Sequence, residues 1–475
     1  MNSNIMLNDL KQAGFSHVIS FFNKNKDKRL VDILDDIFTT KNQCSSIYKD
    51  RLIHNALLFC QDNVKDNIKD SLIGYVNNTD TLLCANHAGL ENHPMLIAST
   101  LLCSIYFAKK GINALPLCAC STINPSNATK PTSLFLDTRR ESNFQHHSFR
   151  ITPQSLDKSP LLCLNAPAFN DYNKLLQRSN NLNIDPNIKA KLFKSIVNLK
   201  EHAKTLSQCN SMLYLLHTFN TQIYRSYISP YLQINPIFIP QELLVSDLLL
   251  SDLDNTDSFI SKTLTSQDLF LKLLHSLSGK SDTWSCELLD CDNNDPDIFK
   301  RSKGSVLFYY LENSRLKPLK LCSFKSTLYL CDGAQEFKLD RSSLMQYLKD
   351  RVLIPNLYLC YSSLYFEHKV RTAGGIFMTN YLKNMLYKTA SVLSLPLHDN
   401  FFLDNIISAV VLPFMVAQKS NQRRPLYLLD MIESHIDKNF LDTLLDRPLN
   451  DFFEQTATEM IYDFTSRDTI LKHCK

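Results

Sequence analysis

Glycine is scarce in this chain, at only 9 of 475 residues. No G-x-G-x-x-G pattern and no Walker-type loop occurs, so the common glycine-rich phosphate-binding loops are excluded. The low glycine content also favours helices, because glycine destabilises a helix interior.

Long apolar runs are lacking too. The longest candidates, 94–108 and 406–417, are shorter than the roughly 20 residues that a transmembrane helix needs, and Pro413 interrupts the second.

A strong charge excess is also absent. The formal net charge is +4, and Lys and Arg form no block, so we expect no nucleic acid as a partner. The short apolar runs predict no membrane partner. The 14 cysteines show no C-x-x-C spacing, and most of them lie in apolar runs. The N-terminus lacks the layout of a signal peptide. This pattern predicts buried free thiols in a reducing, cytoplasmic compartment and no metal site.

From about residue 80, short apolar runs alternate with helical segments, which predicts an α/β fold with a mainly parallel sheet. The expected strands are 81–85, 114–118, 161–164 and 236–239, and the expected helices are 94–109, 186–207 and 212–228. A polar loop spans 121–160. Three β-rich runs, 306–311, 317–324 and 327–331, predict an antiparallel meander, followed by a helix (342–349), a strand (357–361) and a helix (377–391).

Five regions follow from this pattern. They are an N-terminal helical region (1–77), the first part of the α/β core (78–301), the inserted meander (302–340), the second part of the core (341–395) and a helical C-terminal extension (396–475).

The segment 81–94 is the strongest candidate for a site. It predicts a buried strand, a polar turn with Gly89 and a helix starting at Pro94, and such strand-to-helix turns form ligand crevices in α/β sheets. Asn86 and His87 are the candidate catalytic residues, as hydrogen-bonding group and general base, with His93, Asn92 and Gly89 as further substrate contacts. The alternative is that these residues cap and shape the turn, with Asn92 as the N-cap.

Two further turns carry candidate binding residues. Asn124 and Asn127 follow the second predicted strand and either orient a ligand or serve as ordinary turn residues. Gly374 and Gly375 precede a helix and allow close backbone approach, or form a plain turn. Arg371 is a candidate for an acidic ligand group, against a surface ion pair with Glu367. We predict that the Gly89 and Gly374 turns face one crevice, with the loop after Cys120 as its third wall. A metal held by His87, His93, Cys118 and Cys120 matches no standard ligand spacing.

The stretch 85–94 reads A-N-H-A-G-L-E-N-H-P. It resembles the G-Q-Q-x-G-L-x-x-G-P motif of the bacillithiol-biosynthesis cysteine-adding enzymes, and Gly374-Gly375 after the meander resembles that family's paired glycines. The resemblance covers roughly residues 76–395 and implies a Rossmann-like core. The chain departs from the family where Asn86-His87 replaces Gln-Gln, where His93 replaces a glycine and where Met378 replaces a glutamate. The family's acidic stretch after the second strand and its C-terminal coiled coil are also missing.

The resemblance implies a cytoplasmic bacterial enzyme of ligase or transferase type. Such an enzyme forms or remodels a bond on a small polar metabolite, by amino-acid or thiol conjugation, in a specialised biosynthetic pathway. The second interpretation is a non-catalytic binding or scaffold protein that retained the fold. The third is an acyltransferase using His87, since His87-x-x-x-x-Asn92 is similar to the H-x-x-x-x-D motif. The cofactor stays open: the resemblance allows a nucleotide, although no phosphate-loop motif is present. The oligomeric state stays open as well.

Overall fold

The computed structural model describes residues 11, 16–39, 44–60, 65–127, 130–137, 146–206, 210–277, 305–324, 327–375, 378–395, 415–417, 423–432, 434–453 and 456. Four parallel strands form its largest sheet, in the order β12 (Arg371–Ala373), β1 (Thr81–His87), β2 (Ala114–Cys120), β5 (Asn235–Pro240). The strands are almost entirely buried, as expected when helices cover both faces of a parallel sheet. The predicted α/β fold with a mainly parallel sheet is confirmed.

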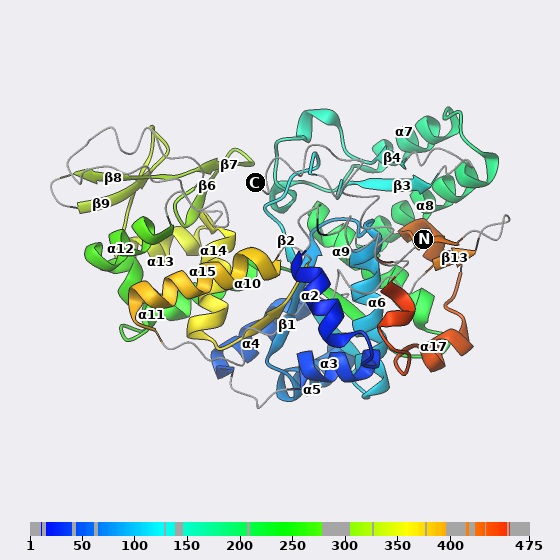
Figure 1. The fold of residues 1–475 in the computed structure, drawn as a ribbon. Helices are drawn as coiled ribbons and strands as arrows, with labels where there is room; N and C mark the ends of the chain where they lie inside the picture. The colour runs from blue at the N-terminus through cyan, green and yellow to red at the C-terminus, as the bar shows by residue number, and fades with distance from the viewer. Residues whose placement is uncertain are drawn as a thin grey trace.

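Helices surround this sheet. Figure 1 shows β1 and β2 in the middle of the molecule, with β6–β9 towards one end and β3 and β4 towards the other. α6 (Pro94–Lys109) connects β1 to β2 and is buried along most of its length; a proline in its first turn suits the helix start. The other helices that precede the meander are α2 (Ser16–Asn25), α3 (Leu30–Phe38), α4 (Ser46–Leu58), α5 (Lys65–Asn78), α7 (Phe169–Asn180), α8 (Pro186–Thr205), α9 (Met212–Ile228), α10 (Gln241–Asp254), α11 (Phe259–Thr265) and α12 (Gln267–Leu277).

β5 lies at one edge of the sheet, and α9 packs along it. Thr221 Oγ1 donates to the carbonyl of Pro236 at 2.6 Å, and His217 Nδ1 lies 2.8 Å from the carbonyl oxygen of Phe238. Proline at 236 and at 240 has no N–H group to offer. Side chains of α9 therefore form hydrogen bonds with two backbone carbonyls of the edge strand β5.

The predicted meander is antiparallel, but it divides into two small sheets. The first has the order β11-β6-β7 and the second the order β10-β9-β8. The division falls between β7 and β8, at Leu319, whose carbonyl accepts from Val306 N–H at 2.9 Å. The strands are β6 (Phe308–Glu312), β7 (Arg315–Pro318), β8 (Lys320–Phe324), β9 (Thr327–Cys331), β10 (Glu336–Lys338) and β11 (Leu353–Pro355), and the helix α13 (Arg341–Lys349) follows β10.

Two predicted strands are wrong. Residues 161–164 begin with a 3₁₀ turn (Leu161–Cys163), whose first two N–H groups donate to the loop after β2. Residues 357–361 belong to α14 (Leu357–Ser362), because Asn356 caps that helix by accepting from Leu359 N–H at 3.0 Å. Both runs are apolar and largely buried, so they carry no periodicity that separates strand from helix.

The polar loop 121–160 and the C-terminal extension each contain strands that were not predicted. β3 (Ser133–Asp137) pairs with β4 (His146–Arg150), and β13 (Met415–Ala417) pairs with β14 (Arg423–Pro425). The extension also includes α16 (Leu428–Met431) and α17 (Lys438–Leu444), and α15 (Met378–Leu393) precedes it. The prediction of an entirely helical extension is therefore wrong.

Eight described cysteines are free thiols, six of them buried, as the sequence predicts. Cys331, in contrast, is disulfide-bonded, which departs from the prediction of free thiols.

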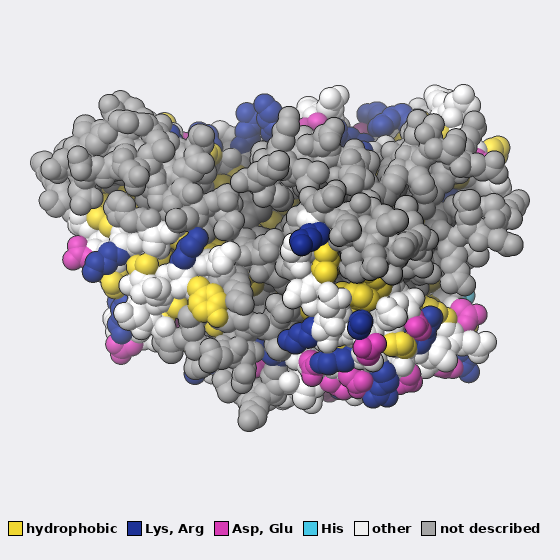
Figure 2. All heavy atoms as spheres, in the orientation of Figure 1, with side chains coloured by type: hydrophobic (Ala, Val, Ile, Leu, Met, Phe, Trp, Pro, Cys, Tyr) yellow, Lys and Arg dark blue, Asp and Glu magenta, His cyan; other side chains and the backbone are white. Residues whose placement is uncertain are grey.

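Among the described helices, none combines the length and apolarity that crossing a bilayer demands. The lower part of the face in Figure 2 mixes Lys and Arg with Asp and Glu. Exposed ion pairs such as Lys28–Asp36 and Lys110–Asp35 involve residues of α3.

Candidate functional site

The carboxyl end of β1 carries the two predicted catalytic side chains. Asn86 is buried and lies beside Ala119 of β2, whereas His87 is half-buried and lies beside Cys120. The Ala88 N–H donates to the Cys120 carbonyl at 2.9 Å, which extends the strand pairing into the turn. The turn therefore leaves β1 at the carboxyl edge of the sheet, where α/β proteins bind their ligands.

Asn86 is part of a buried polar network with Glu91, Thr100 and Tyr224. Its Nδ2 donates to Glu91 Oε1 and, at 3.1 Å, to Thr100 Oγ1. Thr100 Oγ1 donates to the same carboxyl oxygen at 3.0 Å, and the Tyr224 hydroxyl donates to Glu91 Oε2. The network ties the end of β1 to α6 and α9.

Burial raises the pKa of Glu91 to about 8, although the hydrogen bonds from Tyr224 and Thr100 oppose the shift. At neutral pH the carboxyl group is therefore mostly protonated in the folded protein. The unfolded chain releases that proton near the ordinary glutamate pKa. The stabilising contribution is complete below that ordinary pKa, and it is lost as the pH rises towards 8.

We expect a Glu91→Gln variant to gain stability relative to the wild type as the pH rises from 5 to 9. The amide cannot ionise, so the difference between the two unfolding free energies should change by on the order of 4 kcal/mol over this range. Urea unfolding followed by circular dichroism at several pH values measures this difference. Parallel stability curves for the two proteins would show that Glu91 does not carry the linked proton.

The turn after β1 is held against the loop before β3. Gly89 has φ +108°, and a Cβ atom placed on it would lie 2.4 Å from the carbonyl oxygen of Pro131. The same carbonyl accepts from Leu90 N–H at 2.7 Å, and Asn220 Nδ2 donates to the Gly89 carbonyl at 2.7 Å. The close approach at Gly89 is thus made by Pro131. The structure gives the glycine a packing role, where the sequence suggested a ligand contact.

Asn92 and His93 shape the same turn. Buried Asn92 donates from Nδ2 to the carbonyls of Ser133 at 2.5 Å and Leu90 at 3.3 Å. His93, not Asn92, is the N-cap of α6, because its Nδ1 accepts from Met95 N–H at 3.4 Å. The interpretation of Asn92 as the N-cap is therefore wrong, since its side chain reaches across to β3.

Glu242, in the first turn of α10, fixes the loop after β2. This buried carboxylate accepts from Ser121 N–H at 2.9 Å and Ser121 Oγ at 2.6 Å. It also accepts from Thr122 N–H at 3.3 Å and Thr122 Oγ1 at 2.9 Å, and Cys120 Sγ donates to it at 3.3 Å. With five donors around it, Glu242 is a structural anchor for the loop.

Cys120 lies beside His87 but is not an activated nucleophile. Burial, and the negative charge of Glu242 next to it, raise the pKa of the Cys120 thiol well above its usual range. Only the thiolate is a strong nucleophile. The pair of Cys120 and His87 therefore does not form a thiolate–imidazolium couple.

The loop after β2 also reaches His87. Burial and the nearby His93 lower the pKa of His87 to about 4, and a hydrogen bond with Asn127 opposes the shift. Asn124 instead serves the turn itself, because its Oδ1 accepts from Ser126 N–H at 3.2 Å and Ser126 Oγ at 2.7 Å. Of the two candidate asparagines, the structure brings Asn127 to His87.

Arg371 lies at the opposite end of the strands. It pairs with Thr81, the first residue of β1, and its Nε donates to Asp80 Oδ1 at 3.1 Å. Its Nη2 donates to the carbonyl of Ile37 at 2.6 Å. The predicted ligand contact of Arg371 is wrong, because the buried guanidinium is committed to these two partners. The alternative pairing with Glu367 is wrong as well.

The paired glycines follow β12 towards the carboxyl edge. Ala373 pairs with Leu83 of β1, so Gly374 and Gly375 come next in the direction of Asn86. Gly374 is buried and Gly375 is half-buried. A shared crevice between this turn and the Gly89 turn stays a prediction, and residues 376–377 lie outside the described part of the chain.

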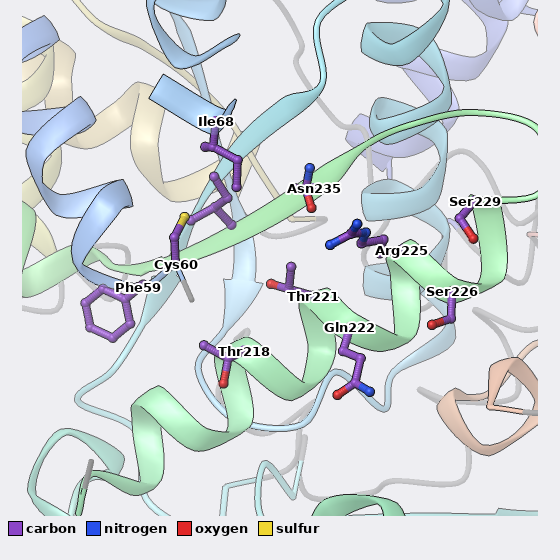
Figure 3. Close-up of a pocket in the computed structure, with 11 residues that line it drawn as sticks. Phe59, Cys60, Ile68, Thr218, Thr221, Gln222, Arg225, Ser226, Ser229 and Asn235 are labelled. Atoms are coloured by element: carbon purple, nitrogen blue, oxygen red, sulfur yellow. The ribbon is translucent and has the colours of Figure 1, made fainter. Parts of the chain in front are cut away.

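Two pockets lie elsewhere. One of about 220 Å³ lies beside the start of β5, and Figure 3 shows Arg225 of α9 pointing between Thr221 and Asn235 within it. The other, of about 480 Å³, lies between α4, α10, α13 and the start of α9, and is lined by both apolar and charged side chains. Neither pocket is lined by Asn86 or His87.

The chemistry available at the carboxyl edge centres on His87. An imidazole with a pKa of about 4 is uncharged at neutral pH, so it can accept a proton or donate a hydrogen bond from one nitrogen. The start of α6 adds no free N–H group beside it, because Pro94 has none, Met95 N–H donates to His93 Nδ1 and Leu96 N–H donates to the His93 carbonyl. Within the described ranges, no group of three or more His, Cys, Asp or Glu side chains has the geometry to hold a metal ion.

Sequence reasoning missed Glu91, Tyr224 and Glu242. Glu91 stands inside the motif 85–94, and an acidic residue between an apolar strand and an apolar helix is a signal for a buried carboxyl group. Glu242 follows Pro240 at the end of β5, at the same sheet edge as Cys120. Tyr224 gave no signal, because an aromatic residue in an apolar helix is typical of the core.

No protein-family model matches the chain, and no curated protein matches it in a sequence search.

Proposed function

We propose that the protein is an enzyme that forms or remodels a bond on a small polar metabolite, with His87 as general base and Asn127 as its orienting partner. The observation that carries the proposal is a half-buried, uncharged histidine at the carboxyl end of the central strand pair. Asn86 acts in this scheme as a positioning residue, because its amide belongs to the buried network with Glu91.

The strand order supports a Rossmann-like core, which the resemblance to the cysteine-adding enzymes implies. The connection from β1 runs to β2 on one side, while β12 pairs with β1 on the other. Such a reversal of strand order marks the ligand crevice in doubly wound sheets. The ligase- or transferase-like reaction is part of this proposal through the resemblance alone, and the nucleotide requirement stays open. A cytoplasmic location is proposed from the free thiols.

A non-catalytic binding protein is the second candidate. The observation that favours it is the internal commitment of both carboxyl groups at this edge, since Glu91 and Glu242 accept hydrogen bonds from neighbouring side chains. The acyltransferase interpretation is less well supported. Asn92 directs its amide at the backbone of Leu90 and Ser133, whereas that motif uses its acidic residue to orient the histidine.

The test starts with a panel of L-cysteine, amino-sugar conjugates and ATP, screened singly and in combination. Binding is measured by thermal shift, and products are measured by mass spectrometry. We expect a saturable shift in the wild type and a new product mass. His87→Ala should retain binding but lower turnover at least a hundredfold, as loss of a general base does. His54→Ala, which removes an exposed histidine on α4, is the matched control.

The outcomes separate the two candidates. Binding without a product in any combination favours the binding protein. Unchanged turnover in both His87→Ala and Asn86→Ala would show that the site has been misassigned. A proton titration of His87 by NMR, assigned with the His87→Gln variant, should give a pKa well below the ordinary histidine value of about 6.5.

A further inference from the structure

A second arrangement of reactive side chains lies at the amino end of the sheet, away from His87. Ser45 Oγ lies 2.8 Å from His368 Nδ1, and His368 Nε2 lies 3.2 Å from Asp252 Oδ1. Ser363 Oγ donates to the other Asp252 oxygen at 3.1 Å. The backbone joins the same residues, because Ser45 N–H donates to the His368 carbonyl at 3.1 Å. A hydroxyl, an imidazole and a carboxylate thus stand in the order of a nucleophile, its base and the orienting acid.

The local structure positions each member. Ser45 is the N-cap of α4, Asp252 is in the last turn of α10, and His368 follows a π-helical turn (Ser363–Glu367). Such π-helical turns are rare and are often found at functional sites. Lys369, the next residue, has φ +56°, a conformation that costs energy in a residue with a side chain.

Burial increases inwards along the three side chains. Ser45 is half-buried, whereas His368 is 1% exposed and Asp252 is 3% exposed. The nucleophile therefore lies at the solvent side and the carboxylate in the interior. The Asp252–His368 contact lacks the alignment of a hydrogen bond, as is common for catalytic contacts before a substrate binds.

Asp252 favours one tautomer of His368, because a proton on Nε2 faces its carboxylate. In that tautomer Nδ1 accepts the Ser45 hydroxyl proton, while Ser45 Oγ accepts from Tyr48 N–H at 3.1 Å. The N–H groups of Ser46 and Ile47 have no partner within α4, because the first turn of any helix leaves them unpaired. Both residues are exposed, so these groups can receive a developing oxyanion beside Ser45.

We propose that Ser45 is a nucleophile that accepts an acyl group from a small ester, with His368 as its base. Ser45 Oγ forms a bond to the carbonyl carbon while its proton moves to His368 Nδ1, and Asp252 stabilises the imidazolium. The intermediate then expels the alcohol, which takes the proton from His368. Water, deprotonated by His368, then attacks the acyl carbon. The bond to Ser45 Oγ breaks, His368 returns the proton to Oγ, and the carboxylic acid is released.

Helix capping alone does not account for the arrangement. A cap needs only the contact between Ser45 and Tyr48 N–H. The buried ionisable pair behind it loses hydration, and well-packed apolar side chains often serve stability as well or better. This site lies at the edge of the sheet opposite His87, so it does not depend on the function proposed above.

The test uses a fluorophosphonate probe on the full chain, with the adduct located by peptide mass spectrometry. We expect a single adduct on Ser45 and slow hydrolysis of p-nitrophenyl acetate. Ser45→Asn should abolish both, although asparagine caps a helix as well as serine does. Ser434→Ala, which removes an exposed hydroxyl outside this site, should leave both unchanged. His368→Gln and Asp252→Asn should each slow labelling at least tenfold.

The proposal is overturned if the folded wild type acquires no adduct on Ser45, or if the adduct lies on another residue. It is also overturned if Ser45 is labelled at the wild-type rate in both His368→Gln and Asp252→Asn, because His368 and Asp252 would then not activate Ser45. Thermal unfolding of each variant verifies that it is folded. Labelling in His87→Ala should equal that of the wild type, which keeps this test separate from the first site.

Discussion

Replacing Gly89 with alanine is expected to lower the free energy of unfolding by at least about 3 kcal/mol. The new methyl group would lie 2.4 Å from the Pro131 carbonyl oxygen and 2.6 Å from Pro131 Cβ, well inside van der Waals contact. The Leu90 N–H bond to the same carbonyl prevents the loop from simply moving away. Alanine would also be strained at φ +108°.

Gly111→Ala is the matched control. Gly111 also has a positive φ, +77°, but no atom lies within 4 Å of the position that its Cβ would occupy. The free energy of unfolding of this variant should fall by only about 1–2 kcal/mol, which is the cost of a positive φ in a residue with a Cβ atom. Urea unfolding of both variants measures the difference. Equal losses for Gly89→Ala and Gly111→Ala would mean that backbone conformation, and not the contact with Pro131, dominates at Gly89.

Replacing Arg371 with methionine is expected to cost about 3–5 kcal/mol, because the substitution leaves Asp80 buried without its ion pair. Side-chain exposure is 7% for Arg371 and 6% for Asp80, so water cannot replace the lost partner. The carbonyl of Ile37 loses a donor in the same substitution. The double variant Asp80→Asn with Arg371→Met should recover part of the loss, since no unpaired charge remains.

An exposed ion pair provides the comparison. Lys174 and Asp171 lie 3.2 Å apart with side-chain exposures of 74% and 48%. Lys174→Met should leave the unfolding free energy almost unchanged, because such surface pairs contribute little. A loss in Arg371→Met no larger than that in Lys174→Met would contradict the structural role of Arg371.

The sequence predicted three strands of the sheet because β1, β2 and β5 are six or seven residues long and buried, but it did not predict β12, which has three residues. β1, β2 and β5 each match an apolar run, and α6 and α9 match their predicted bounds. The failures share a cause, because 161–164 and 357–361 are short apolar runs whose structure is decided by tertiary contacts and a cap. No local pattern distinguishes the two outcomes in a run of that length.

The site was predicted less completely than the fold. The strand-to-helix turn identified Asn86 and His87, but the partners Asn220, Tyr224 and Glu242 lie more than 100 residues away in the chain. Arg371 shows the same limit. Its position before the glycine pair suggested the carboxyl edge, yet the three-residue strand β12 places its side chain at the amino end, near Asp80.

The hydrogen bonds from side chains of α9 to the edge strand β5 also limit how two copies of this protein can associate. The unpaired carbonyl and N–H groups of an exposed edge strand can form hydrogen bonds with an extended segment of another chain. Molecules then associate through strands added to the sheet. Along β5, Thr221 and His217 bond two of the carbonyls, and prolines replace two of the N–H groups. A strand from another molecule would have to displace a seventeen-residue helix to pair there. The sheet therefore stops growing at β5, and contacts between copies have to form on other surfaces.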